Sequence, residues 1–357
     1  MNVGFIGTGT MGQPMVANLV RKGFTVVAYD VVPEALAAAV KAGAAGAGSG
    51  AEVARRSELI VTMLPSSSHV EAAYLGAGGV LEGVAAGRLC VDMSTIDPAV
   101  SRRVAAALAQ QHVRFVDAPV SGGVPRATDG TLAIMVGGDA RDLDEARPAL
   151  AAMGAAIVHV GPIGSGEVAK LCNNLIAGVA AVAVSEAFRI AEGFGVDARV
   201  LTDVISRSSG NTWVMEHMHP VPGLVARSAS SQDYAPGFMT DLMAKDLGLA
   251  VDAARQLRVP VVVAPAAQQV LRLAPHALAQ HRDPHCRASE AELIAALTGH
   301  YRPEQVDSRT PLHHLTGVDL TQLAAIGPYH TLQLVIPSPL RFEGLSGGGR
   351  RGRRRIL

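Results

Sequence analysis

Residues 2–30, "NVGFIGTGTMGQPMVANLVRKGFTVVAYD", decide the fold. A short apolar strand leads into Gly7, Gly9 and Gly12, a helix follows, and a second strand ends at Asp30. In a G-x-G-x-x-G loop between strand and helix, the first glycine makes the turn and the second lets a pyrophosphate approach the backbone. The third lets the helix pack closely on the strand. The stretch therefore predicts a dinucleotide-binding βαβ unit.

Asp30 predicts which dinucleotide this unit binds. A carboxylate at the end of the second strand accepts hydrogen bonds from ribose hydroxyls and repels a 2′-phosphate. No arginine follows it, because the next residues are Val31 and Val32. These residues favour NAD over NADP, with a simple turn role as the alternative for Asp30. Met11, inside the glycine loop, is assigned to the same cofactor site.

Apolar runs of strand length continue to about residue 163. They are "ELIVTML", "RLCVDMS", "VRFVDAPV", "LAIMVGG" and "AAIVHV", and helical patterns separate several of them. Strands that alternate with helices indicate an α/β fold with a parallel sheet covered on both faces. We therefore expect a Rossmann-type, doubly wound parallel sheet at the N-terminus.

After Gly164 long helical segments replace the strands, over residues 166–194, 198–207 and 239–257, and no convincing strand precedes Pro260. An all-helical substrate domain is therefore expected after the sheet. Residues 1–163 are predicted to form an NAD-binding domain, and residues 164–290 a helical substrate and dimerisation domain. Residues 291–357 are predicted to be an atypical, partly disordered tail.

Composition narrows the classes of function. The formal net charge is zero, which argues against polyanion binding by the body of the protein. The three cysteines are far apart and form no metal or disulfide pattern, as expected in a reducing cytosol. The N-terminus has no signal character, and the apolar run 175–184 is too short to span a bilayer. We therefore expect a cytoplasmic protein without a membrane partner, and without a nucleic-acid partner for the body of the protein.

Small polar residues follow two of the predicted strands, in "TMLPSSS" and "VDMSTID". Strand ends line the ligand crevice of a doubly wound sheet, so Leu64, Pro65 and Thr95 are candidate cofactor contacts. Simple strand punctuation is an equal alternative for either loop.

The stretch "DAPVSGG", residues 117–123, follows another strand. Its Ser121, Gly122 and Gly123 expose backbone N–H groups with little side chain in the way, which suits a substrate carboxylate. An ordinary turn explains the spacing equally well.

Lys170 and Asn174 share one face of the helix that begins near Gly164, where the nucleotide-binding region ends. Only four of the 31 basic residues are lysine, and this one stands on an apolar face. A partly buried amine beside a nicotinamide cation has a lowered pKa and can act as a general base, which arginine cannot. Asn174 would orient the substrate. The alternative is a lysine whose tip reaches solvent.

Lys245, in "MAKDLGLA", is a second lysine on an apolar helix. It either pairs with Asp241 or Asp246 or reaches toward the cofactor.

Four segments, "GFIGTGTMG", "DAPVSGG", "GSGEVAKLCNN" and "LMAKDLGLA", resemble in order and spacing the four signatures of the β-hydroxyacid dehydrogenases. Two more, "STIDPAVS" and "HPVPG", and the longer stretch "LMAKDLGLAVDAA" around the fourth signature are similar to the branch that oxidises 3-hydroxyisobutyrate in valine degradation. The resemblance covers residues 1 to about 273.

The resemblance implies that Lys170 is the catalytic acid/base and that Asn174 lies beside the substrate carboxylate, which residues 121–123 hold. It implies that NAD is contacted by Leu64, Pro65 and Thr95, and that Lys245 lies near the nicotinamide. Trp213 and Phe238 occupy positions that line the family's substrate pocket, although core packing is an equal explanation. A homo-oligomer, dimer or tetramer, is implied as well.

The chain departs from the family after about residue 273. The segments "ELIAALTGHYRPEQ" and "LTGVDLTQLAAIGPYHTLQLV" weakly resemble pieces of insertion-sequence transposases, which suggests a gene fusion or frameshift. His285, Cys286, His313 and His314 have the spacing of no standard metal site, so no metal is expected. The final "RRGRRR" is read as a solvated end.

The leading hypothesis is the NAD-dependent oxidation of 3-hydroxyisobutyrate to methylmalonate semialdehyde. The alternatives are a reductase of tartronate semialdehyde or another short β-hydroxyacid, an inactive homologue damaged at its C-terminus, and nucleic-acid binding through the arginine-rich end.

Overall fold

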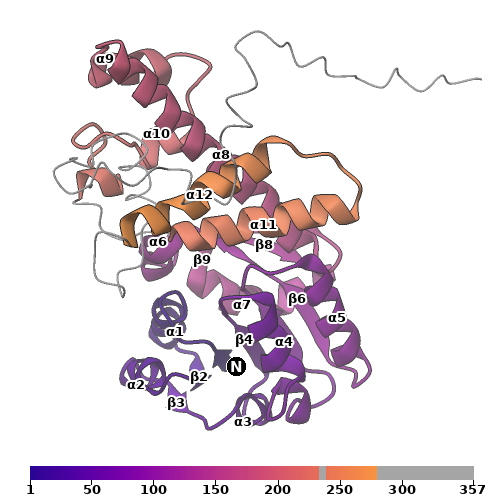
Figure 1. Cartoon of the computed structure of the whole chain (residues 1–357). Coiled ribbons are helices and arrows are strands. Elements are labelled where there is room, and N and C mark those ends of the chain that lie inside the picture. Colours follow the sequence, from indigo (N-terminus) through magenta and orange to yellow (C-terminus); the bar gives the residue numbers. More distant parts are fainter. Residues whose placement is uncertain (233–238, 280–357) are drawn as a thin grey trace, which may run out of the picture. The chain divides into compact units, whose positions relative to one another are not determined.

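The computed structural model describes residues 1–232 and 239–279, and all of them belong to one compact unit of the chain (Figure 1). Of residues 273–279 only the backbone is described. Phe238, His285, Cys286, His313, His314 and the predicted tail therefore lie outside the described residues.

A nine-stranded sheet fills the N-terminal region, in the order β3-β2-β1-β4-β5-β6-β8-β7, with β9 paired to β8. Neighbouring strands are parallel from β3 through β6. The strand order turns back at β1, which leaves the carboxyl ends of β1 and β4 beside the topological switch point where such sheets bind ligands. The strands are β1 (Asn2–Ile6), β2 (Thr25–Tyr29), β3 (Ala45–Gly46), β4 (Leu59–Thr62), β5 (Leu89–Asp92), β6 (Arg114–Asp117), β7 (Val120–Ser121), β8 (Leu132–Gly137) and β9 (Gly154–Gly161).

The far end of the sheet differs from the predicted all-parallel arrangement. Strand β8 runs antiparallel to β6 and β7, and β9 then pairs with β8 in parallel. Only ten residues separate Ser121 from Leu132, which is short for the crossover that a parallel pair requires. The short helix α6 (Gly123–Asp129) and the left-handed Gly130 instead turn the chain back on itself.

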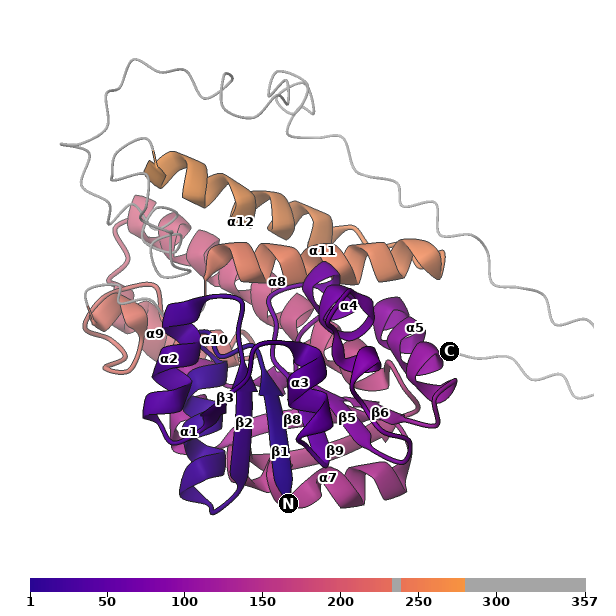
Figure 2. The same cartoon turned by 90° about the horizontal axis from the view of Figure 1, so that it is seen from below.

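Helices cover both faces of this sheet (Figure 2). They are α1 (Gly12–Arg21), α2 (Pro33–Lys41), α3 (Gly50–Arg55), α4 (Ser67–Leu75), η1 (Val80–Glu82), α5 (Pro98–Ala109) and α7 (Ala140–Met153). Successive strand residues point to opposite faces, so Val3 and Phe5 pack in one apolar cluster while Ile6 packs in the other. This two-sided burial explains why the strands read as continuous apolar runs.

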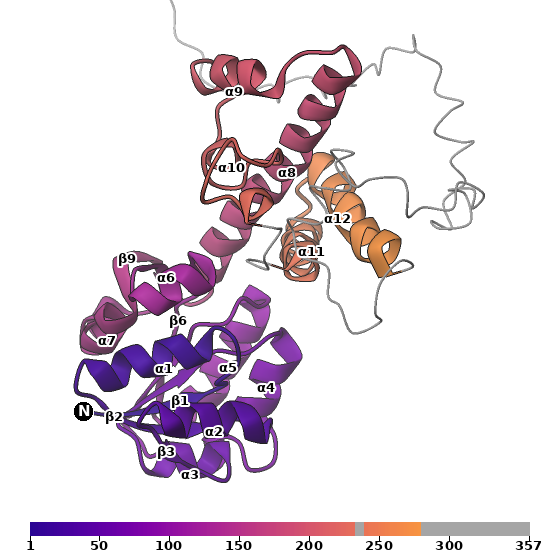
Figure 3. The same cartoon turned by 90° about the vertical axis from the view of Figure 1, so that its left-hand side faces the viewer.

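Helices make up the region after residue 164, as predicted. The segments expected over 166–194, 198–207 and 239–257 are α8 (Ser165–Gly193), α9 (Ala198–Ser206) and α11 (Thr240–Gln256). Three further elements were not predicted: α10 (Trp213–His217), η2 (Ala229–Ser231) and α12 (Val263–Ala279). Helices α11 and α12 pack on each other and on α8, around Met243, Leu247 and Leu271 (Figure 3).

Helix α8 is long and apolar enough, by length and composition alone, to cross a membrane, with a mean hydropathy of 1.6 over 18 residues. Its buried residues include Glu167, Lys170 and Asn174, and it contacts β6, β8 and β9 of the sheet as well as α11 and α12. These contacts make it the central helix of the described region, on which the two halves of the candidate site meet.

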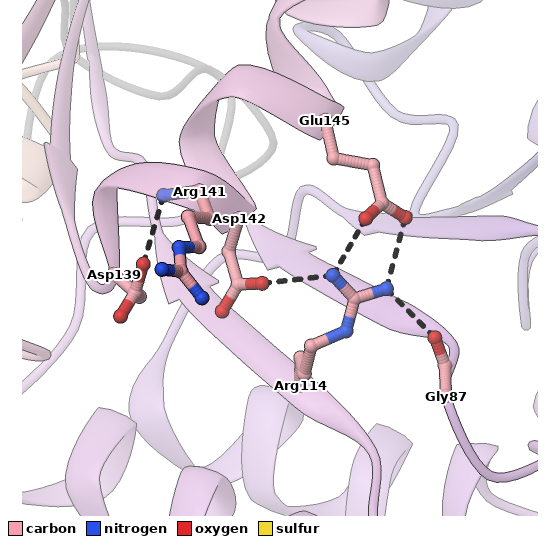
Figure 4. A network of polar contacts seen from close by, with 6 residues as sticks. All are labelled: Gly87, Arg114, Asp139, Arg141, Asp142 and Glu145. Carbon is pink, nitrogen blue, oxygen red and sulfur yellow. Dashed lines mark hydrogen bonds and ion pairs between the residues drawn. The ribbon is translucent and has the colours of Figure 1, made fainter.

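An ion-pair cluster lies at the N-terminal end of β6, where the strand begins with Arg114. Arg114 donates two hydrogen bonds to Glu145, at 2.6 and 2.9 Å, and a third to Asp142 at 2.8 Å (Figure 4). Its guanidinium also donates to the Gly87 carbonyl at 2.7 Å. The cluster ties β6 to α7 at the surface, away from the carboxyl ends of the strands.

Candidate active site

The glycine loop has the conformation that dinucleotide binding requires. Gly7 has φ +95°, and a side chain there would collide with the Met63 carbonyl. A side chain at Gly12 would collide with the Gly7 carbonyl, whereas nothing lies within 4 Å of the corresponding position at Gly9. Two glycines therefore pack the loop tightly, and the third leaves an open approach to the backbone at the start of α1. The loop fits a bound pyrophosphate on this ground.

Asp30 lies directly beside that loop. Its carboxylate accepts hydrogen bonds from the Thr8 backbone N–H at 2.6 Å and from the Val32 N–H at 2.9 Å. Oδ2 also accepts a longer hydrogen bond from the Thr8 hydroxyl at 3.3 Å, whereas Oδ1 keeps a lone pair for a ribose hydroxyl. The following Val31 side chain is 79% exposed and offers no positive charge for a 2′-phosphate. Met11, also in the loop, packs against the core of the sheet.

Lys245 joins the helical region to the loops after β4 and β5. Its ammonium donates hydrogen bonds to the carbonyl oxygens of Thr95, at 2.7 Å, and Pro65, at 3.3 Å. It also forms an ion pair with Asp246 at 3.2 Å. Both alternatives offered by the sequence are thus present: the lysine pairs with its neighbour and reaches the predicted cofactor loops.

Leu64 completes this edge of the crevice. Its backbone N–H donates to the Ser94 hydroxyl at 2.9 Å, and its side chain lies against Gly7. The structure therefore brings together Leu64, Pro65, Thr95 and Lys245, which come from three separate parts of the sequence.

Lys170 and Asn174 lie one turn apart on α8, and both side chains are buried, with 6% and 4% of their surface exposed. The Asn174 amide donates to Asp246 at 2.5 Å and accepts a hydrogen bond from Asn173 at 3.0 Å. These two bonds fix which way the Asn174 amide faces. The alternative that the tip of Lys170 reaches solvent is therefore wrong.

Burial is the main influence on Lys170 and lowers the pKa of its amine. The nearby carboxylates of Asp246 and Glu167 act in the opposite direction, and the charge of Lys245 lowers the pKa further. The net direction is downward, toward the range in which a lysine can accept a proton near neutral pH.

Ser121, Gly122 and Gly123 lie at the end of β7 and the start of α6. Gly122 has φ +137° and Gly123 has φ +63°, so the turn needs glycine at both positions. The stem of Arg126 packs over Gly122. Within the described residues, no hydrogen bond connects this turn to Lys170 or Asn174, so the two halves of the predicted substrate site are not joined by direct contacts.

Comparisons with known proteins cover both regions. Residues 2–161 match the NAD binding domain of 6-phosphogluconate dehydrogenase, and residues 164–288 match the family described as NAD-binding of NADP-dependent 3-hydroxyisobutyrate dehydrogenase. An NAD-dependent L-serine dehydrogenase of Pseudomonas aeruginosa is 44% identical over 71% of this chain and 85% of its own length. A 3-hydroxyisobutyrate dehydrogenase of the same organism is 40% identical over 78% and 94%.

A solved Mycobacterium tuberculosis 3-hydroxyisobutyrate dehydrogenase, with L-serine, superposes with a TM-score of 0.76 at 38% identity. The match covers 83% of this chain and 98% of that protein. The chain belongs to the 3-hydroxyisobutyrate dehydrogenase family. Its fold is therefore the one predicted, a Rossmann-type sheet followed by a helical region. The chain is an oxidoreductase, and its cofactor is NAD.

The family binds a dinucleotide, and the described residues fit such a cofactor. Among residues 1–232 and 239–279, no group of three or more His, Cys, Asp and Glu side chains could hold a metal ion. The open backbone at Gly9 and the carboxylate of Asp30 fit the cofactor, and Lys170 lies on α8, whose first turn contacts the loop after β5 through Glu167 and Ile96.

Three buried carboxylates beside this site were missed by reasoning from sequence: Asp92, Asp117 and Glu167. Asp92 and Asp117 end the neighbouring strands β5 and β6 in register, and Asp117 accepts hydrogen bonds from Gly164 and Glu167 at the start of α8. The available signal was an aspartate at the end of each of two adjacent apolar runs, since such ends meet at one edge of a parallel sheet.

Proposed function

We propose that this chain oxidises 3-hydroxyisobutyrate to methylmalonate semialdehyde, with Lys170 as the general base. The observation that carries the proposal is that Lys170 is buried on the face of α8 that also bears Asn174. The charges of Asp246 and Lys245 both influence the pKa of its amine. Family membership supports the substrate through the 3-hydroxyisobutyrate dehydrogenase relatives.

The reaction divides between the cofactor and the residues of the chain. NAD, held by the glycine loop and Asp30, would supply the acceptor for the hydride that leaves C3 of the substrate. Lys170, in its neutral form, takes the proton of the C3 hydroxyl, so that the oxygen forms the aldehyde carbonyl as the C–H bond breaks. Asn174 donates to the substrate through its remaining N–H. Backbone N–H groups of Ser121, Gly122 and Gly123 receive the carboxylate.

Cofactor binding is proposed to involve nine residues. The glycine loop meets the pyrophosphate, Asp30 accepts the ribose hydroxyls, and the crevice loops with Lys245 border the nicotinamide. The set is Gly7, Gly9, Met11, Gly12, Asp30, Leu64, Pro65, Thr95 and Lys245. We propose no nucleic-acid or membrane partner, a cytoplasmic location, and the domain division 1–163, 164–290 and 291–357.

L-Serine is the second candidate substrate. It has the same three-carbon 3-hydroxy acid skeleton, with an ammonium group at C2 in place of the methyl group. The 44% identity to an L-serine dehydrogenase favours it.

An activity screen separates these candidates. The purified protein is assayed for NADH formation with 3-hydroxyisobutyrate, L-serine and other small 3-hydroxy acids, each with NAD and with NADP, and in reverse with tartronate semialdehyde. We expect the highest kcat/KM with 3-hydroxyisobutyrate and NAD. A higher value with L-serine would transfer the assignment to the second candidate. An NAD-dependent rise in melting temperature without turnover on any acid would indicate an inactive homologue.

We also propose that the chain forms a homo-oligomer through its helical region. Helix α9 has no buried residue, and its Val200 and Val204 are more than half exposed. Ile176 and Phe194, in and just after α8, are 69% and 85% exposed. Exposed apolar surface of this kind marks an interaction site. Light scattering after size-exclusion chromatography should give a dimer or tetramer, and charged substitutions at Val200 and Val204 should shift it toward monomer.

A further inference from the structure

Glu167 stands in the first turn of α8, three residues before Lys170, and its side chain has no exposed surface. One carboxyl oxygen, Oε2, accepts a hydrogen bond from the Ile96 backbone N–H at 3.1 Å. The other oxygen, Oε1, is buried and has no hydrogen-bond partner within the described residues. An ionised carboxylate in this position would keep a buried charge on Oε1 that no donor among the described residues compensates, which is costly.

The surroundings of Glu167 add negative charge. Asp92 and Asp117, at the ends of β5 and β6, are both fully buried. Asp117 uses its oxygens for the backbone N–H groups of Gly164 and Glu167. Asp92 accepts three hydrogen bonds on Oδ1 from Thr62 and Ser94, but its Oδ2 has no partner. A second and a third carboxylate therefore stand close to Glu167.

The nearby cations do not neutralise Glu167. Lys245 and Asp246 of α11 pair with each other, and the lysine donates to backbone carbonyls. Arg102 of α5 lies against Gly164 at the start of α8. Neither these groups nor Lys170 form an ion pair with Glu167 in the part of the chain that the structure describes. Burial and then the charge of Asp92 raise the pKa of Glu167 well above its ordinary value.

We propose that Glu167 is a positioning residue that keeps a proton on Oε1 and stays neutral while Lys170 acts. The idea rests on the proposed role of Lys170. As a neutral acid, Glu167 holds the first turn of α8 against the loop that contains Thr95 and Ile96. It also leaves Lys170 without a negative charge one turn before it, so the amine releases its proton more readily.

Infrared spectroscopy of the unliganded protein, with carboxyl-labelled glutamate, tests the protonation state directly. The wild type should show the carbonyl stretch of a protonated glutamic acid at about pH 8, well above the ordinary glutamate pKa, and Glu167→Gln should lack it. Absence of this band from the wild type would overturn the proposal. Because the measurement needs neither substrate nor turnover, it stands even if 3-hydroxyisobutyrate is not the substrate.

The pH profile of kcat gives the second readout. Glutamine is neutral and keeps an oxygen for the Ile96 N–H, so in Glu167→Gln the midpoint of the profile should stay where it is in the wild type. If Glu167 were ionised, its removal would lower the pKa of Lys170 and move the midpoint by about one unit toward lower pH; that shift would contradict the proposal. Glu167→Ala, which loses the bond to Ile96, should raise KM for NAD several-fold, and an unchanged KM would refute the positioning role.

Discussion

The two ends of β6 carry opposite kinds of charge cluster. At its beginning, Arg114 is partly exposed and fully paired with Asp142, Glu145 and a backbone carbonyl (Figure 4). At its end, Asp117 is buried beside Asp92 and Glu167, two of whose oxygens have no partner. Two residues of one strand thus separate a cluster whose charged groups are paired from one in which two buried carboxyl oxygens have no partner among the described residues.

The pKa values follow this difference. Arg114 lowers the pKa of Glu145, as expected for a paired surface carboxylate. Burial raises the pKa of Asp92, Asp117 and Glu167. Paired surface charges connect elements, whereas buried charges without full compensation are found at sites where protons move. The comparison therefore locates the chemistry at the carboxyl ends of the strands.

The largest effect is expected at Lys170. Lys170→Ala should lower kcat by about two to four orders of magnitude, the usual contribution of a general acid/base, and leave NAD affinity nearly intact. Lys170→Arg should fail to restore turnover, because arginine keeps its proton. NADH absorbance gives kcat, and a fluorescence titration gives the affinity for NAD. Substantial turnover by the arginine variant would remove Lys170 from the proton-transfer step.

The next effect concerns stability. Burial raises the pKa of Asp92 to about 6, against about 3.9 in an unfolded chain. The folded state therefore binds more protons between these values, and the free energy of unfolding falls as pH rises through about 4 to 6. Two pKa units correspond to about 3 kcal/mol. Asp92→Asn keeps an oxygen for Thr62 and Ser94 without the charge, so it should be more stable than wild type near pH 8.

Melting curves of wild type and Asp92→Asn across this pH range test whether the stability of the wild type falls as pH rises. The matched control is Glu145→Gln at the other end of β6, where the pKa is lowered and the ionised form is favoured. That variant should be less stable than wild type at neutral pH, and its deficit should shrink as pH falls through the pKa of Glu145. The same direction of change in both variants would break the contrast between the two clusters.

A smaller effect is expected for cofactor choice. Asp30→Ala should weaken NAD binding and raise the ratio of NADP to NAD activity by about tenfold, equivalent to about 1.4 kcal/mol, because the carboxylate no longer repels the 2′-phosphate. Asp30→Asn is the control that removes the charge and keeps one oxygen as an acceptor for the Thr8 or the Val32 N–H. The measurement is kcat/KM with both cofactors. An unchanged ratio in both variants would mean that Asp30 does not face the ribose.

The smallest effect is expected at the paired cluster. Arg114→Ala should cost about 1 kcal/mol or less of stability, as is typical of exposed ion pairs, with kcat and its pH profile unchanged. Arg147→Ala, which removes an exposed pair with Asp144 within α7, is the matched control and should cost still less. Denaturant titrations and the standard assay are sufficient. A large loss of turnover in folded Arg114→Ala would show that the two ends of β6 are coupled.

Local patterns made most of the fold predictable from sequence. The glycine loop, the alternation of strands and helices, and the helix that begins near Gly164 are all encoded in neighbouring residues. The antiparallel β8 was missed because pairing direction depends on how the chain returns through α6. Helix α12 was missed because the stretch that leads into it and forms its first turns, "VPVVVAPAAQQ" (residues 259–269), is rich in β-branched residues and proline. Packing against α8 and α11 stabilises it despite this composition.

The site was predictable where one helix face or one strand end carried the signal. Lys170 and Asn174 share a face, and Lys245 stands out among few lysines. Partners distant in sequence were not predictable: Asp246 meets Asn174 across 72 positions, and Glu167 meets Ile96 across 71. Such contacts depend on the packing of α8 and α11 against the sheet, which no local pattern specifies.

The most direct test of Lys170 as the general base is the pH dependence of kcat for 3-hydroxyisobutyrate oxidation with saturating NAD. Substrate deuterated at C3 shows through its isotope effect whether hydride transfer limits the rate. We predict that kcat rises with pH and levels off, with a midpoint below the ordinary lysine pKa of about 10.4, and that Lys170→Arg lacks this rise. A flat wild-type profile between about pH 6 and 10, with the isotope effect present, would contradict it.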